Sequence, residues 1–190
     1  MSALQGRGAR KYPRLVRGDE QVGAGGAPRA YLYLDVDGVL CPYVAPDETP
    51  TSWSDLGEGF VGRRIAVHSP SMLAALGRLG LEIVWCTTWG GQAEHAFGPA
   101  LRGCLQRTLD LAATPLAPGG VKGAAVFTDL RFAPAPFVWV DDDAITVEAV
   151  ERLETLELPM LLIEPDRTVG LEPGHVEQIE AFMRAQGLSG

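Results

Sequence analysis

The feature that most constrains the fold of this chain is a short apolar run, Ala30 to Leu34, which leads directly into two aspartates and a glycine. Asp35 and Asp37 are two positions apart, so in an extended chain their side chains face the same side. Gly38 follows, and its missing Cβ allows the chain to bend. This pattern predicts a strand whose carboxyl end delivers two carboxylates to one place.

Two carboxylates at this spacing repel each other unless a cation lies between them. Mg²⁺ takes oxygen ligands and would also neutralise a phosphate group brought beside it. One carboxylate would then attack phosphorus while the other protonates the leaving group. The pair Asp35 and Asp37 therefore favours metal-assisted phosphoryl transfer, although two acids before a glycine are also typical of an ordinary turn.

Three further motifs follow the first one along the chain. The apolar segment that begins at Leu81 ends in Thr87, Lys122 comes after it, and a third apolar segment ends in the aspartates Asp141, Asp142 and Asp143. Together with the first motif, these elements resemble the four ordered signatures of the haloacid dehalogenase-like (HAD) superfamily, which consists largely of Mg²⁺-dependent phosphatases. The segment around Thr87 resembles a version found in small bacterial members.

The resemblance implies a catalytic role for four of these residues. Asp35 would be the nucleophile that forms an aspartyl-phosphate, and Asp37 would be the general acid and base. Thr87 would hydrogen-bond a phosphoryl oxygen, and Lys122 would hold the charges of Asp35 and the phosphate together as a compact cation. Two alternatives stay open: Thr88 replaces Thr87 if the strand is one residue longer, and Lys122 taken alone would be a solvated surface charge.

The resemblance also implies a Mg²⁺ site. Asp35 and the backbone carbonyl of Asp37 would contribute ligands, and Asp141 with Asp142 beside it would complete the shell, directly or through water. Neighbouring strand residues point to opposite faces, so the sequence does not decide which acid reaches the metal, and Asp141 is the first choice. Asp143 precedes an amphipathic segment and is interpreted as a helix N-cap.

Apolar runs alternate with amphipathic segments along the rest of the chain. This alternation predicts an α/β fold, a doubly wound parallel sheet with helices on both faces and a ligand site beyond the carboxyl ends of the strands. The family resemblance implies a Rossmann-like, HAD-type core with the strand order fifth, fourth, first, second, third. The predicted strands are Ala30–Val36, Leu81–Cys86, Leu109–Ala113, Phe137–Val140 and Pro159–Ile163; the predicted helices are Ser71–Leu79, Gly91–Ala100, Val121–Leu130, Ala144–Leu156 and Pro173–Gln186.

Substrate choice in this superfamily usually depends on an inserted cap domain. The two gaps where a cap would be inserted are too short here for a folded domain, so we expect a capless member with an open crevice and a flap at residues 41–69. Trp89, which follows the second motif, would either pack in the core or stack on a base or sugar of a substrate.

Charge is distributed unevenly along the 190 residues, which carry a net charge of −8. Residues 1–29 hold six basic and two acidic side chains, and we expect them to form a basic, disordered leader. The remaining residues 30–190 are strongly acidic and are expected to form a single HAD-like catalytic domain. The leader would allow contact with a nucleic acid or a partner chain.

Three function classes are consistent with these motifs. The first is a Mg²⁺-dependent phosphatase that hydrolyses a phosphorylated substrate of unknown identity. The second is a phosphatase for nucleotides or nucleic-acid ends, and the third is a non-catalytic binding protein with the same fold. No apolar run reaches the ~20 residues that cross a bilayer, and the three cysteines lack metal-type spacing. We therefore expect a cytoplasmic protein with no membrane contact.

Overall fold

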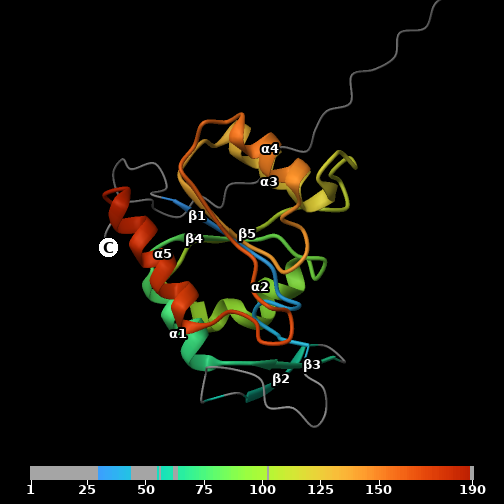
Figure 1. Cartoon of the computed structure of the whole chain (residues 1–190). Helices are drawn as coiled ribbons and strands as arrows, with labels where there is room; N and C mark the ends of the chain where they lie inside the picture. The colour runs from blue at the N-terminus through green and yellow to red at the C-terminus, as the bar shows by residue number, and fades with distance from the viewer. Residues whose placement is uncertain (1–29, 44–54, 56, 62–63, 102, 189–190) are drawn as a thin grey trace, which may run out of the picture.

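The computed structural model describes residues 30–43, 55, 57–61, 64–101 and 103–188. The predicted leader lies outside these ranges, as does most of the first half of the predicted flap. A sheet lies at the centre of the molecule (Figure 1), and it contains five strands. They are β1 (Tyr31–Leu34), β4 (Glu82–Trp85), β5 (Gln106–Thr108), β6 (Phe137–Val140) and β7 (Met160–Ile163).

The strands lie in the order β5-β4-β1-β6-β7, and all four pairings are parallel. Read from the β7 edge, this is the predicted order of fifth, fourth, first, second and third strand. β1 is central, and all four of its residues are buried. Its alternate residues serve opposite faces of the sheet, which explains why the run is apolar throughout instead of alternating with polar residues.

Helices cover both faces of the sheet, which confirms the doubly wound α/β prediction (Figure 1). The helices are α1 (Pro70–Arg78), α2 (Gly91–Phe97), which continues into the 3₁₀ turn η1 (Gly98–Leu101), α3 (Gly120–Phe132), α4 (Val147–Glu154) and α5 (Pro173–Ala185). On one face of the sheet, Leu32 and Leu34 pack with residues of α1, α2 and α5. On the other face, Tyr31 and Tyr33 pack with residues of α3 and α4.

The edge strand β5 differs from the prediction. It runs over Gln106–Thr108, whereas the predicted strand was Leu109–Ala113. Asp110 ends the extended segment, because its carboxylate accepts the N–H of Ala113 at 3.0 Å and its carbonyl accepts the hydroxyl of Thr114. The true strand is polar because it lies at the edge, so an apolar run was the wrong signal there.

The start of α4 is also corrected. Asp143 is not the N-cap; Thr146 is, and its side chain accepts the N–H of Ala149 at 3.3 Å. The intervening residues stay in a loop because Oδ1 of Asp141 accepts the N–H groups of Asp143 at 3.2 Å and Ala144 at 2.9 Å. A buried carboxylate at the end of β6 thus competes with helix formation for these backbone donors.

The second half of the predicted flap forms an antiparallel hairpin of β2 (Gly57–Val61) and β3 (Arg64–His68). The imidazole of His68 packs edge-on against the ring of Phe97 in α2, with 5.4 Å between the ring centroids. This contact joins the hairpin to the helix that follows the second motif. Within the described ranges, no helix is long and apolar enough to span a membrane.

Candidate active site

The predicted site residues come together because parallel strands bring their carboxyl ends to one edge. The chain leaves β1 at Asp35, whose N–H donates to the carbonyl of Val140 in β6. Asp141 follows β6 and donates its N–H to Ile163 in β7, and Cys86 donates to Leu34 in β1. The backbone hydrogen bonds between neighbouring strands therefore continue one residue past the end of each strand. This extension holds the first residues of the neighbouring loops next to one another.

A tight turn follows Asp35 and makes room for a carboxylate from another motif. The carbonyl of Val36 accepts the N–H groups of Leu40 and Cys41, each at 2.9 Å. Gly38 has φ +71°, and a Cβ there would lie 2.5 Å from the carboxyl carbon of Asp142. Glycine is thus required at this position for two reasons, the left-handed backbone conformation and the close approach of Asp142.

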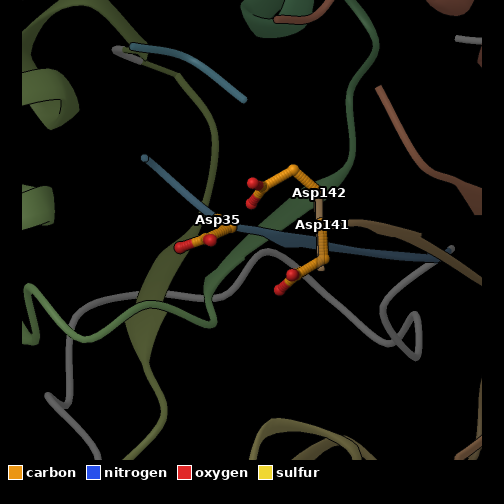
Figure 2. Close-up of side chains that lie close together, drawn as sticks. All are labelled: Asp35, Asp141 and Asp142. Atoms are coloured by element: carbon orange, nitrogen blue, oxygen red, sulfur yellow. The ribbon is translucent and has the colours of Figure 1, made fainter. Parts of the chain in front are cut away.

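Three carboxylates gather at this point (Figure 2). One carboxylate oxygen from each of Asp35, Asp141 and Asp142 lies within 4.8 Å of the other two, and Figure 2 shows Asp35 beside the consecutive pair. Asp35 is 4% exposed and Asp141 is 0% exposed. Removing three acids from water in one small space is costly, so a cation must compensate for much of their charge.

Lys122 supplies part of this compensation. Its Nζ lies 2.6 Å from Oδ2 of Asp35 and 2.9 Å from Oδ2 of Asp141, so it bridges the two acids. α3 can bring the lysine this close because the adjoining glycines permit contact with α4. A Cβ on Gly119 would lie 2.7 Å from the backbone of Ala149, and one on Gly123 would lie 2.9 Å from its Cβ.

The pKa shifts of the bridged groups indicate that Lys122 alone does not fully compensate the charges of Asp35 and Asp141. Burial raises the pKa of Asp141 to about 6; Lys122 opposes this increase, and the charge of Asp35 adds to it. Burial likewise raises the pKa of Asp35, against the influence of Lys122. Burial disfavours the charged form of Lys122, but the two carboxylates outweigh burial and raise its pKa. The acids therefore remain under-compensated at neutral pH.

The donor set fits a hard divalent cation. Oxygen ligands within a few ångströms of one another are what Mg²⁺ requires, and the described cluster offers carboxylates only. The excess negative charge at Asp35 and Asp141 provides an electrostatic reason to bind one. Asp35, Asp141 and Asp142 are the residues that would hold the ion.

The carboxylate of Asp37 lies outside the three-acid cluster and faces another partner. Its Oδ2 accepts the indole N–H of Trp89 at 2.8 Å. Trp89 also packs against Phe97, with 6.0 Å between the ring centroids. Trp89 thus belongs partly to the core and partly to the site, and the sequence analysis did not anticipate its bond to the second aspartate. A tryptophan two residues after a site threonine was the available signal.

Of the two threonines, Thr87 faces the acids. It is 1% exposed, it opposes the rise in the pKa of Asp35, and its Oγ1 accepts the N–H of Trp89 at 3.3 Å. Thr88 is exposed. Both line a cavity of about 300 Å³ that opens beyond β4 and β5.

A basic residue that was not predicted from the sequence contacts the acid cluster at Asp142. Arg167, in the loop after β7, donates to Oδ2 of Asp142 from Nη2 at 2.9 Å and from Nε at 3.2 Å. Its Nη2 lies 3.7 Å from the exposed Asp143. Its guanidinium also lies over the ring of Tyr43, 5.1 Å from the centroid. No local motif marks this arginine, because its partners are far away in sequence.

Comparison with known families agrees with this geometry. Residues 31–176 match the family model described as "HAD domain in Swiss Army Knife RNA repair proteins". No curated protein and no solved structure matches the chain significantly. HAD domains are generally hydrolases, and the matched range contains every element of the sheet and every predicted site residue. The chain therefore belongs to the HAD family of Swiss Army Knife RNA repair proteins.

Proposed function

We propose that the protein is a Mg²⁺-dependent phosphomonoester hydrolase that acts through an aspartyl-phosphate on Asp35. The observation that carries this proposal is the bridge that Lys122 makes between Asp35 and Asp141, beside Asp142. The bridge holds a nucleophilic carboxylate next to a cation-binding pair in a buried site. A bound Mg²⁺ would supply charge neutralisation for the incoming phosphate.

Several side chains act together in the first half of the reaction, which forms the aspartyl-phosphate. A carboxylate oxygen of Asp35 attacks phosphorus, and the ester bond to the leaving oxygen breaks. Asp37 gives its proton to that oxygen, while Trp89 holds its carboxylate in place through the 2.8 Å hydrogen bond. Thr87 and Lys122 donate to the transferred group, so the developing charge meets fixed donors instead of reorganising water.

The second half regenerates the enzyme. Asp37, now ionised, takes a proton from a water molecule, and the oxygen of this water attacks phosphorus. The bond between phosphorus and Asp35 breaks, and inorganic phosphate leaves with Asp35 again a free carboxylate. Burial of Asp35 limits access of bulk water to its carboxylate, so hydrolysis depends on the water that Asp37 activates.

We infer that the substrate is a phosphorylated RNA end. The support is the family model that matches residues 31–176, whose description names RNA repair proteins. The segments 35–69, between β1 and α1, and 86–119, between β4 and α3, are too short for a folded cap domain, which suits an open crevice that accepts the end of a polymer. The basic residues 1–29, outside the described ranges, would add contacts with the RNA backbone.

The cysteines support a proposed location for the protein. Cys41, Cys86 and Cys104 are free thiols, which fits a proposed reducing, cytoplasmic environment.

The test is phosphate release with Mg²⁺ from RNA and DNA oligonucleotides phosphorylated at the 3′ or 5′ end, with nucleotides and sugar phosphates alongside. The wild type should prefer an RNA end, and Asp35→Asn should lose about a thousandfold or more in rate while remaining folded. Asp143→Asn is the matched control, since this neighbouring acid is 61% exposed and has no proposed role in the chemistry. Near-normal turnover by Asp35→Asn would exclude the covalent mechanism, and a wild type that releases no phosphate would favour a non-catalytic binding protein.

A further inference from the structure

An exposed aromatic ring lies at the mouth of the acid site. Tyr43 is 52% exposed and comes two residues after Cys41, which closes the first-motif turn. Among the described residues, the other large aromatic with a highly exposed side chain is Phe132, at the end of α3. Lys122 lies in the first turn of α3, so the far end of this helix points away from the acids.

Arg167 contacts both the ring and the backbone of Tyr43. The guanidinium of Arg167 lies 5.1 Å from the ring centroid, and the N–H of Tyr43 donates to the carbonyl of Arg167 at 2.8 Å. Arg167 is itself fixed by its two bonds to Asp142. The ring therefore has a cation against one face.

The loop that carries Arg167 is docked closely on the first-motif turn. The N–H of Leu171 donates to the carbonyl of Val39 at 2.8 Å, and a Cβ on Gly170 would lie 2.6 Å from that same oxygen. Gly170 has φ +76°, so glycine allows both the backbone conformation and the contact. The two loops thus present Tyr43 and Arg167 as one rigid unit.

The unit stands on the side where the leaving group departs. The backbone of Cys41, two residues before Tyr43, pairs with the backbone of Asp37, and Arg167 donates to the carboxylate of Asp142, so the unit lies beside both acids. In agreement with this position, burial and the charges of Asp37 and Asp142 raise the pKa of the Tyr43 hydroxyl. Asp37 is the proposed proton donor to the leaving oxygen. We therefore expect the group attached to this oxygen to lie near Tyr43.

We propose that Tyr43, backed by Arg167, is a stacking surface for the base of the terminal nucleotide that carries the phosphate. The inference rests on the proposed function and adds a base-binding subsite to it. Stacking on an aromatic ring tolerates any base, because every base has a π face. A repair enzyme that acts on RNA ends of varied sequence needs this type of recognition.

The experiment compares Tyr43→Ala, Tyr43→Phe and the control Phe132→Ala. The substrates are a phosphorylated RNA oligonucleotide, the same oligonucleotide with an abasic terminal nucleotide, and glycerol phosphate. Tyr43→Ala should raise KM for the base-bearing end roughly tenfold, with little change on the abasic end or on glycerol phosphate. Tyr43→Phe should behave like the wild type, because it keeps the ring, and Phe132→Ala should be unchanged on all three substrates.

Equal losses on glycerol phosphate and RNA would overturn the proposal, since they would show that Tyr43 only supports the acids. Equal KM values of the wild type for base-bearing and abasic ends would overturn it as well. Binding of the RNA end to Asp35→Asn, followed by fluorescence anisotropy with and without Tyr43→Ala, separates the two hypotheses. If the wild type releases no phosphate but Tyr43→Ala still weakens binding, the phosphatase proposal fails and the stacking surface stands.

Discussion

The indole N–H of Trp89 donates to Oδ2 of Asp37 at 2.8 Å, so a residue from the second motif holds the proposed proton donor of the first. The bond fixes the carboxylate away from the cluster of Asp35, Asp141 and Asp142. Nucleophile and general acid thus have separate environments, although they are two residues apart. This separation allows one acid to attack while the other transfers a proton.

Trp89→Phe should slow the reaction without unfolding the protein. A hydrogen bond to a charged group contributes roughly 1.5 to 3 kcal/mol, which corresponds to a loss of about 10- to 100-fold in kcat. The loss should be largest on alkyl phosphates and smallest on an activated aryl phosphate, because the aryl leaving group needs little protonation. Steady-state kinetics on both esters measure the difference. The melting temperature should change little, because phenylalanine retains the contact with Phe97; equal losses on the two esters would assign Trp89 to packing alone.

Stability without a divalent cation should fall as the pH rises from about 4 to about 6. The pKa of Asp141 is 3.8 in its ordinary state and about 6 in the folded protein. Between these values the folded state binds more protons than the unfolded state, so deprotonation penalises folding, by at most roughly 3 kcal/mol at 1.36 kcal/mol per pKa unit. The raised pKa of Asp35 acts in the same direction. Lys122 stays charged throughout this range and adds no slope.

Chemical denaturation between pH 4 and pH 8, with a chelator and with excess Mg²⁺, measures this dependence. Mg²⁺ should raise the free energy of unfolding most above pH 6, because it binds the ionised acids of the native state. Asp141→Asn should flatten the chelator curve. An unchanged curve in excess Mg²⁺ would remove the metal site from the proposed function.

Most of the sheet could be predicted from the sequence because β1, β6 and β7 are apolar from end to end and β4 is apolar after Glu82. Asp35, Thr87 and Asp141 were found near the points where such runs end, after Leu34, Cys86 and Val140. The edge strand β5 could not be located in this way. Its residue Arg107 is fixed by ion pairs to Glu82 and Asp129, both distant in sequence, and not by apolar packing.

Contacts between residues that are distant in sequence also explain why two residues at the mouth of the site were not predicted. Arg167 and Tyr43 are ordinary loop residues until the fold brings the end of β7 against the turn after β1. Thr146 replaced Asp143 as the N-cap because Asp141 captured the intervening backbone donors. Contacts between residues of different motifs decided each of these cases, and a single sequence carries little information about such contacts.

Deleting residues 1–29 should separate RNA binding from chemistry. Turnover of small esters should be unchanged, because the proposed catalytic groups all lie within residues 30–190. Binding to RNA ends should weaken, and the slope of log K against log salt should become shallower, since each lost phosphate contact releases about one counterion fewer. Titrations at several salt concentrations measure the slope. Identical affinity and slope for the two proteins would remove the leader from the RNA contact.

Gly38→Ala should abolish Mg²⁺ binding through Asp142. The new Cβ would lie 2.5 Å from the carboxyl carbon and Oδ2 of Asp142, so this side chain must move out of the cluster. The backbone is strained as well, because φ is +71° and a left-handed conformation costs an alanine roughly 1 to 2 kcal/mol.

Gly80→Ala provides the matched control for the backbone strain. Gly80 has φ +68°, but no atom lies within 4 Å of the position of its Cβ, and it precedes β4 at the edge of the sheet opposite the acids. Both variants should therefore melt at similarly lowered temperatures. Calorimetric titration should find Mg²⁺ binding in Gly80→Ala and none in Gly38→Ala, and phosphate release should follow the same division. If both variants bind Mg²⁺ with the affinity of the wild type, the position of the Asp142 carboxylate does not matter, and the metal is held by Asp35 and Asp141 without it.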